Sequence, residues 1–312
     1  MTADRRRIWS PLPTPTQARL VHLVLAPTLD PVELEAWSRA VDLKALDEGS
    51  QRLLPSLYLR LKAAGVDHPW LSLMQAQHRR WYFRNRLLIR RGLAVVRKLA
   101  REGIPCLLLK GAALAPRYYA DLGERPMGDF DILVPEATPP AAVQALLTAD
   151  GGLRLRERAL HAHAYRDRGG FECDIHWHLM PELSYGGSGA PLWERAEPME
   201  LEGESCRTLS PEDHVYHLLA HGLRVSDVPP LRWIVDTATV LLATPQFDWS
   251  RLLDQVVRSA TIYPVAAGLS VLVDKGLTGS EGGKALATLE ASAQRRVDRY
   301  LFAGQMRRPV RR

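Results

Sequence analysis

The sequence predicts a mixed α+β fold, in which a small mixed sheet with its own helices is flanked by helical regions at both ends of the chain. Apolar residues recur at three- and four-residue spacing as far as Gly103, which is typical of amphipathic helices. Short apolar and alternating runs follow, which are typical of strands, and the helical spacing returns after Arg207. We therefore predict a helical N-terminal region, a mixed core and a helical C-terminal region with a basic tail, at residues 1–103, 104–207 and 208–312.

The last helix expected in the N-terminal region, from about Trp70 to Glu102, is strongly basic. Its positive side chains include Arg79, Arg80, Arg84, Arg86, Arg90, Arg91, Arg97 and Lys98. Such a helix could hold phosphate groups or RNA, or its arginine stems could cover apolar surface on a solvated face. Both interpretations stay open, because the charges ring the helix instead of forming one stripe.

Composition indicates a globular cytoplasmic protein. Hydrophobic residues make up 46% of the chain and charged residues 24%, close to the average of globular proteins. The first residues lack the apolar stretch of a signal peptide. The longest apolar run, Tyr263 to Val273, is far shorter than the roughly 20 residues of a membrane-spanning helix. We therefore expect no membrane partner.

The end of the chain carries much of the net charge of +6. Its arginines are Arg295, Arg296, Arg299, Arg307, Arg308, Arg311 and Arg312. A basic tail can bind nucleic acid. A solvated terminus is the favoured interpretation, because chain ends are usually mobile.

Two carboxylates open the apolar run that ends at Val134. Asp129 and Asp131 are two residues apart, so in a strand they share a face, while Phe130 and Ile132 point the other way. Neighbouring carboxylates repel each other unless a cation lies between them. The pair predicts a metal site, and asparagine at either position is expected to preserve the fold and even to stabilise it slightly.

A second strand is predicted between Phe171 and Leu179, where polar and apolar side chains alternate. One face carries Glu172, Asp174, His176 and His178, and the other carries Cys173, Ile175, Trp177 and Leu179. An ionisable row on a core-forming strand must meet water, a metal or a ligand, because burying it without partners costs free energy. If this strand lies beside the first, Asp174 joins the two earlier carboxylates and Trp177 is buried on the opposite face.

A third element is the apolar run from Leu107 to Leu109, which turns at Gly111 into a helix-like segment. Backbone amides at the start of such a helix, with Lys110 adjacent, suit a phosphate group. An ordinary strand-to-helix turn has the same pattern, so this signal alone does not decide between the two.

Together these segments resemble the nucleotidyltransferase superfamily that includes DNA polymerase beta, and more closely a bacterial branch of it, the uncharacterised nucleotidyltransferase family 5. The similarity extends over roughly Ile104 to Leu242. It is carried by Lys110-Gly111-Ala112, Arg125-Pro126-Met127-Gly128-Asp129-Phe130-Asp131-Ile132-Leu133-Val134, Asp174-Ile175-His176-Trp177, Pro211-Glu212-Asp213-His214 and Leu231-Arg232-Trp233-Ile234-Val235-Asp236. Ala112 departs from the wider superfamily, which has serine or glycine after the turn glycine.

The resemblance implies a nucleotidyltransferase core that moves a nucleoside monophosphate from a nucleoside triphosphate, with ATP expected, to an unidentified small molecule, peptide or protein. It implies two Mg²⁺ ions held by a catalytic triad, which stabilise the attacking and leaving oxygens. The implied residues are Asp129, Asp131 and Asp174 as catalytic metal ligands, Lys110, Gly111, Arg125 and Gly128 for the nucleotide, and His176 as a second layer or acceptor contact.

Two other functions stay open at this stage. One is a catalytically silent module that binds nucleotide or RNA through the basic helix and tail, although nucleic acid is the less favoured partner. The other is a zinc-dependent hydrolase built on closely spaced histidines, such as His161 and His163 or His214, His217 and His221. The absence of a recognisable zinc-hydrolase motif disfavours the hydrolase.

Overall fold

The computed structural model describes residues 12–181, 183, 189–223, 231–259 and 261–292, and it has the mixed α+β fold that the sequence predicts. The N-terminal residues before Leu12 and the arginine-rich tail lie outside the described residues. The chain divides into two compact units, one of residues 72–214 and one of residues 1–71 with 215–312. The limits of these units differ from those of the three predicted regions, and the division into three regions stays a prediction.

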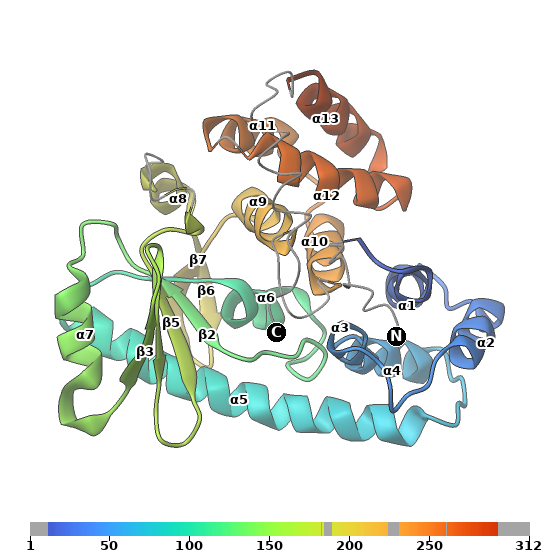
Figure 1. The fold of residues 1–312 in the computed structure, drawn as a ribbon, viewed down its shortest axis with the longest axis horizontal. Helices are drawn as coiled ribbons and strands as arrows, with labels where there is room; N and C mark the ends of the chain where they lie inside the picture. Colours follow the sequence, from blue (N-terminus) through green and yellow to red (C-terminus); the bar gives the residue numbers. More distant parts are fainter. Residues whose placement is uncertain (1–11, 182, 184–188, 224–230, 260, 293–312) are drawn as a thin grey trace, which may run out of the picture. The chain divides into compact units, whose positions relative to one another are not determined.

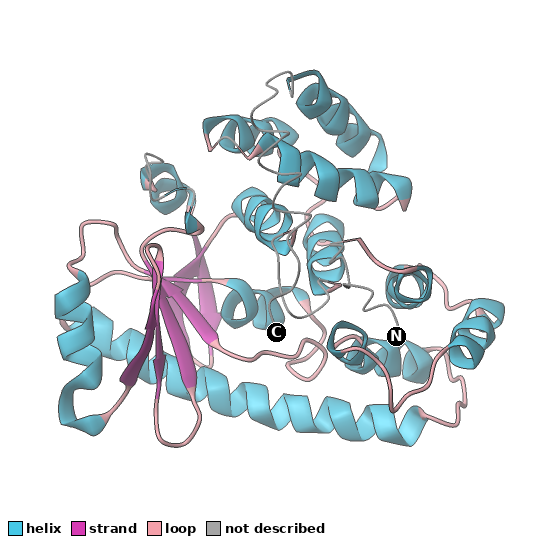
Figure 2. Ribbon diagram, in the orientation of Figure 1, coloured by secondary structure: helices cyan, strands magenta, loops and turns pink. Residues whose placement is uncertain are grey.

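The unit of residues 72–214 is built on one seven-stranded mixed sheet with the strand order β3-β4-β5-β2-β1-β7-β6 (Figures 1 and 2). The pairs β2–β5 and β1–β7 are parallel, and the other neighbouring pairs are antiparallel. The strands are β1 (Leu107–Leu108), β2 (Phe130–Leu133), β3 (Arg154–Arg158), β4 (Ala162–Arg166), β5 (Glu172–His176), β6 (Glu197–Leu201) and β7 (Glu204–Thr208).

Helices complete this unit. They are α5 (Leu71–Arg101), α6 (Lys110–Tyr118), α7 (Pro140–Thr148), the 3₁₀ turn η1 (Ala149–Gly151), α8 (Ala190–Arg195) and the start of α9 (Pro211–Gly222). β1 covers only Leu107–Leu108, because Pro105 has no backbone N–H to donate and the chain enters α6 at Lys110. Ser210 caps α9, since its Oγ accepts a hydrogen bond from the Asp213 amide at 3.3 Å.

The core of this unit lies between α5, α7 and one face of the sheet. Phe130 and Ile132 of β2 and Ile175 of β5 are fully buried there, together with Ile89 of α5 and Val143 of α7. The spacing of two along each strand puts the intervening residues on the opposite face. Apolar alternation therefore fixes which face of β2 and β5 is left for the carboxylates.

Close approach between α5 and β2 requires glycine at position 92. A Cβ built on Gly92 would lie 2.3 Å from the ring of Phe130, which is fully buried. We expect Gly92→Ala to lower the free energy of unfolding by about 1–3 kcal/mol, because the helix or the ring must move. Chemical denaturation measures this change.

A matched control is available on an open helical surface. A Cβ on Gly283, in α13 (Gly279–Ser292), would meet no atom within 4 Å. Gly283→Ala should therefore be neutral or stabilise by up to about 1 kcal/mol, because alanine favours helix. Equal stability of the Gly92→Ala variant and the unmodified protein would contradict the packing described for α5.

The second unit is helical in its described residues. It contains α1 (Pro15–Leu25), α2 (Pro31–Ala40), α3 (Glu48–Gln51), α4 (Leu54–Ala63), the remainder of α9, α10 (Arg232–Leu242), α11 (Trp249–Arg258), α12 (Ile262–Asp274) and α13. Thr14 and Gln17 form a capping box at α1, and the Asp30 side chain caps α2. The Asp30-Pro31 pair thus starts a helix.

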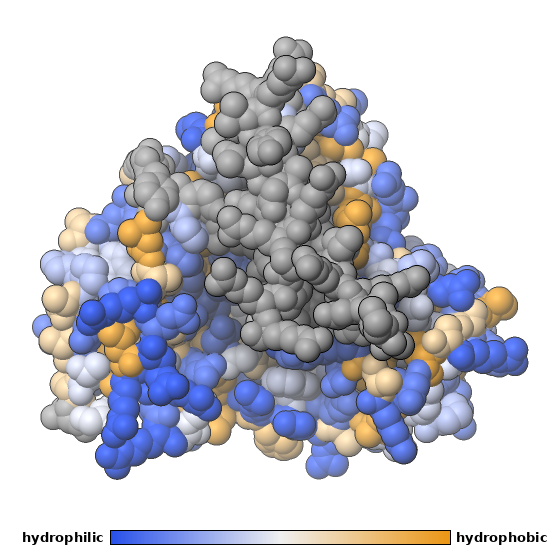
Figure 3. Space-filling model, in the orientation of Figure 1, coloured by the Kyte–Doolittle hydropathy of each residue, from blue (hydrophilic) through white to orange (hydrophobic). Residues whose placement is uncertain are grey.

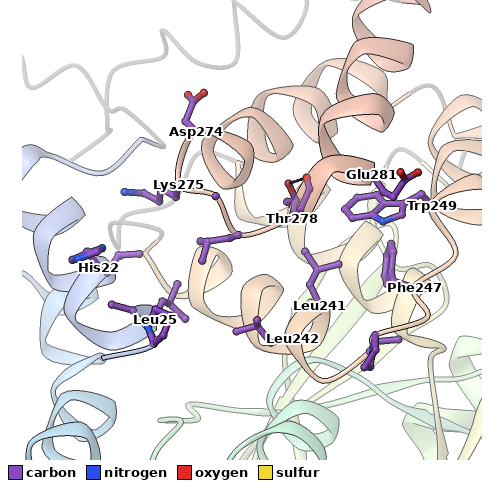
Figure 4. Close-up of a pocket in the computed structure, with 18 residues that line it drawn as sticks. His22, Leu25, Leu241, Leu242, Phe247, Trp249, Asp274, Lys275, Thr278 and Glu281 are labelled. Atoms are coloured by element: carbon purple, nitrogen blue, oxygen red, sulfur yellow. Dashed lines mark hydrogen bonds between the residues drawn. The ribbon is translucent and has the colours of Figure 1, made fainter. Parts of the chain in front are cut away.

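A cavity of about 700 Å³ lies within the second unit, between α1, the end of α10 and the segment from Asp274 to Glu281. Phe247 and Trp249 lie against each other on one side, with ring centroids 4.8 Å apart, and His22 lies toward the other side (Figure 4). None of the site residues predicted from the sequence lines this cavity.

The surface seen in Figure 3 mixes hydrophilic and hydrophobic side chains over α5. Phe83 and Leu87 are exposed hydrophobic residues of this helix. In the described part of the chain, no helix combines the length and the apolar character that crossing a bilayer demands.

Candidate metal and nucleotide site

The two carboxylate-bearing strands are neighbours, which is the condition under which Asp174 joins the earlier carboxylates. β2 and β5 run parallel, and Asp131 pairs in register with Asp174. Residues in register on adjacent strands have side chains close together on the same face. The sheet therefore brings together two carboxylates that are 43 positions apart in the sequence, since 174 − 131 = 43.

The opposite face of β5 confirms the predicted alternation. Trp177 is 6% exposed and belongs to the apolar core, where its Nε1 donates a hydrogen bond to the Thr138 carbonyl at 2.7 Å. Cys173 and Ile175 are fully buried on the same face. Asp174 and His176 consequently point to the other side of the sheet.

Asp131 is the most buried acid of the site, with a side chain only 1% exposed. Its Oδ1 accepts hydrogen bonds from Lys110 Nζ at 2.7 Å and from His176 Nε2 at 2.9 Å. Because a carboxylate oxygen only accepts, His176 must carry its proton on Nε2, which leaves Nδ1 with a lone pair. The imidazole thereby holds the orientation of the carboxylate.

Two buried atoms of this cluster have no hydrogen-bond partner among the described residues. They are Asp131 Oδ2 and His176 Nδ1. Asp131, Asp174 and His176 each offer a ligand atom, and these atoms all lie within 4.8 Å of one another. Carboxylate oxygens with an imidazole nitrogen suit a divalent cation. A cation at this point would also satisfy an otherwise orphaned buried oxygen, so the residues fit the metal that the sequence predicts.

The two aspartates have opposite electrostatic environments. Burial alone would raise the pKa of Asp131, but the Lys110 ammonium and the His176 hydrogen bond outweigh it and hold this pKa below its usual range. Burial raises the pKa of Asp174 to about 7, and the nearby charges of Asp131 and Asp129 add to the increase. Burial and the Lys110 charge lower the pKa of His176, which favours the neutral imidazole.

Asp129 lies at the edge of this cluster. Its charge contributes to the raised pKa values of Asp174 and Lys110, so it is close to both. It is not a member of the three-residue group described above. Gly128 beside it is exposed, and a Cβ there would meet no atom within 4 Å. The structure thus brings Asp131 and Asp174 together with His176 more closely than it does Asp129.

The start of α6 lies next to the acidic cluster. Lys110 is its first residue and has φ +44°, a left-handed conformation that residues with a Cβ rarely adopt. No described side chain caps this helix start. Leu109 donates its amide to the Asp131 carbonyl at 3.1 Å, which holds the turn beside β2.

Arg125 lies close to Gly111 of this turn. It is 3% exposed, and a Cβ built on Gly111 would lie 2.8 Å from Arg125 Nη1 and 2.8 Å from Met127 Cγ. Gly111 therefore allows a close approach of the arginine to the helix. The sequence predicted Arg125 as a nucleotide contact; the structure places its guanidinium beside Gly111, and the contact stays a prediction.

The basic helix predicted around 79–98 uses several of its charges within its own unit. Arg86 pairs with Glu202 at 3.4 Å, Arg97 pairs with Glu204 at 2.8 Å, and Arg91 pairs with Asp167. These arginines tie α5 to the β6–β7 hairpin and to the turn between β4 and β5. Because these arginines already form ion pairs within the unit, their pairing favours a structural role for α5 over a role in which all its arginines bind RNA.

The histidine pairs do not form a metal group in the described part of the chain. Asp131, Asp174 and His176 make up the group found there, and the trio on α9 contributes no member. His176 was expected beside the metal ligands, but its hydrogen bond to Asp131 and the Lys110 contact with the same residue were not predicted, because they depend on strand pairing that the sequence does not display.

Comparisons with known proteins give a family match and a structural similarity. The model of a family described as "Uncharacterised nucleotidyltransferase" matches residues 48–272. No curated protein sequence matches the chain. Among solved structures the chain is similar to the "Crystal structure of an antigenic nucleotidyltransferase-like protein from Paracoccidioides brasiliensis", with 15% sequence identity and a TM-score of 0.40. That similarity covers 64% of this chain and 92% of the other.

Proposed function

The chain belongs to the uncharacterised nucleotidyltransferase family, and from this premise we propose that it transfers a nucleoside monophosphate from a nucleoside triphosphate to an acceptor at the Asp131–Asp174 site. One observation carries the proposal. The two carboxylates are in register on adjacent strands, and Asp131 Oδ2 is buried without a hydrogen-bond partner among the described residues.

Mg²⁺ is the metal that this ligand set and this chemistry favour, with Asp131 and Asp174 as direct ligands and Asp129 completing the set. When bound, the metal would supply charge stabilisation for the attacking and leaving oxygens, a role that two ions share in many phosphoryl-transfer enzymes. His176 orients Asp131 through its Nε2 hydrogen bond. The proposed cofactor is two Mg²⁺ ions, and the proposed donor is ATP.

The proposed reaction is an in-line displacement. An acceptor oxygen attacks the α-phosphorus, the bond between the α-phosphorus and the bridging oxygen breaks, and pyrophosphate leaves. A base at the site takes the acceptor proton, and Asp174 is the candidate because its carboxylate lies in the proposed metal group, where the acceptor oxygen would approach. Lys110 and the uncapped start of α6 supply positive charge for the triphosphate, since helix N-termini favour anions.

The acceptor is proposed to be a small molecule, a peptide or a protein. A silent nucleotide-binding module is the main alternative. The paired carboxylates of Asp131 and Asp174 disfavour this silent module, because nucleotide binding without catalysis does not require two neighbouring carboxylates with a buried, unpartnered oxygen.

One experiment tests the proposed function. The purified protein is incubated with each α-³²P-labelled nucleoside triphosphate, Mg²⁺ and a lysate of the source cell. We expect a labelled product with one of the four donors, and its loss when EDTA removes the metal. Label that accumulates only as hydrolysed nucleotide, or no turnover with any donor, would contradict the proposal.

A further inference from the structure

The ammonium of Lys110 lies against the buried carboxylate of Asp131, where it balances the negative charge of the acidic cluster. Its Nζ is 2.7 Å from Asp131 Oδ1, and the two side chains are 23% and 1% exposed. The charges of Asp131, Asp129 and Asp174 all act on it. Lys110 is therefore the counter-ion of the cluster when no metal is bound.

The backbone is built to hold Lys110 there. Its left-handed φ of +44° costs conformational free energy for a residue with a Cβ, and such conformations persist where neighbouring contacts enforce them. The amide of Leu109 is fixed on the Asp131 carbonyl by the β1–β2 pairing. Residue 110 is consequently anchored beside the acid, while its four-carbon stem stays flexible.

A metal bound through Asp131 Oδ2 and the Lys110 ammonium on Oδ1 would lie on the same carboxylate. Both ring-nitrogen and ammonium donors use Oδ1, and a divalent cation at Asp131 and Asp174 would bring further positive charge close to Nζ. Like charges at short range repel strongly in a partly buried site. Because the Lys110 side chain is partly exposed, it has a route out of the cluster.

We propose that Lys110 is an exchangeable counter-ion, which neutralises Asp131 in the metal-free protein and transfers its ammonium to a donor phosphate when metal and nucleoside triphosphate bind. This inference rests on the proposed function. The start of α6, where Lys110 sits, is the expected position of the phosphates. Exchange would avoid leaving Asp131 without a cation at any stage.

The direct test follows the Lys110 ammonium by NMR in the full chain labelled with ¹⁵N-lysine. A hydrogen-bonded ammonium of this kind should give a slowly exchanging signal in the metal-free protein. The signal is assigned by its absence in Lys110→Arg, which keeps the charge, and in Lys110→Met. We expect the signal to shift or broaden away on addition of Mg²⁺ with a non-hydrolysable ATP analogue.

Affinities supply a second readout that does not depend on activity. Calorimetry should show that Lys110→Met binds Mg²⁺ at least about tenfold more tightly without nucleotide, because no ammonium then repels the bound ion. The same variant should bind the ATP analogue with Mg²⁺ at least about tenfold more weakly. Lys284→Met is the control, because Lys284 forms an exposed ion pair with Glu281 at 2.6 Å, and both affinities should be unchanged.

The outcomes distinguish a failure of the Lys110 exchange from a failure of the proposed function. If the unmodified protein binds Mg²⁺ and the analogue but the Lys110 signal stays unchanged at saturation, the exchange is wrong and the metal site stands. If neither the unmodified protein nor Lys110→Met binds Mg²⁺ with or without the analogue, the proposed function fails and the exchange fails with it.

Discussion

Asp131→Asn is expected to abolish nucleotidyl transfer and also to destabilise the metal-free protein. The amide removes a charged metal ligand, so kcat/KM should fall at least about a hundredfold. It also leaves the Lys110 ammonium without its buried partner, and loss of one member of a buried ion pair costs several kcal/mol. Because Lys110 is partly exposed, we expect a smaller loss of about 2 kcal/mol.

The measurements are transfer of α-labelled nucleotide at saturating Mg²⁺ and guanidinium unfolding in EDTA. Asp254→Asn is a suitable control, since Asp254 is exposed on α11 and its conversion should change neither quantity. Full activity of Asp131→Asn would contradict the assignment of Asp131 as a metal ligand. Unchanged stability would show that the contact with Lys110 contributes nothing to folding.

This expectation corrects one made from the sequence. Adjacent carboxylates predict that asparagine at Asp131 would stabilise the fold slightly by relieving repulsion. The structure gives Asp131 two hydrogen-bond donors, and its pKa is held below the usual range despite burial. The ionised form of Asp131 is thus favoured by folding, and repulsion is relieved at Asp174 instead.

Asp174→Asn is expected to abolish transfer as well, but to stabilise the metal-free protein at neutral and alkaline pH. Burial and the neighbouring aspartates raise the pKa of Asp174 in the folded state to about 7, against an ordinary value of 3.8. The folded state then holds this proton more tightly than the unfolded state. The free energy of unfolding falls as pH rises between those two values, because the unfolded state releases the proton first.

The variant lacks this ionisation, so its advantage over the unmodified protein should be absent below about pH 4, grow between about pH 4 and 7, and level off above. Unfolding curves in EDTA across this range measure the difference. Asp254→Asn, at an exposed position on α11, controls for the substitution itself. A difference between Asp174→Asn and the unmodified protein that is constant with pH would contradict the burial-raised pKa.

Much of the site could be predicted because it depends on local patterns. Alternation over Phe171 to Leu179 assigned Asp174 and Trp177 to opposite faces, and the structure confirms this. The spacing of Asp129 and Asp131 predicted one shared strand face, but β2 begins at Phe130 and Asp129 lies in the bend before it. A period of two is visible in the sequence whatever the strand pairs with.

The remaining features depend on contacts between distant segments. The Lys110 and His176 bonds to Asp131 span 21 and 45 positions. They follow from the order β5-β2-β1 and from the register of each pair, which side-chain patterns do not encode. The grouping of the N-terminal helices with the C-terminal ones in one unit has the same origin.

The most direct test of the central claim locates a bound divalent metal. Crystals soaked with Mn²⁺ and a non-hydrolysable ATP analogue would reveal the ion by its anomalous scattering. We predict a peak within about 2.0–2.6 Å of carboxylate oxygens of both Asp131 and Asp174, the range of metal–oxygen bonds for such ions. A peak bound by the histidines of α9, or well-ordered analogue with no metal at these aspartates, would contradict the account.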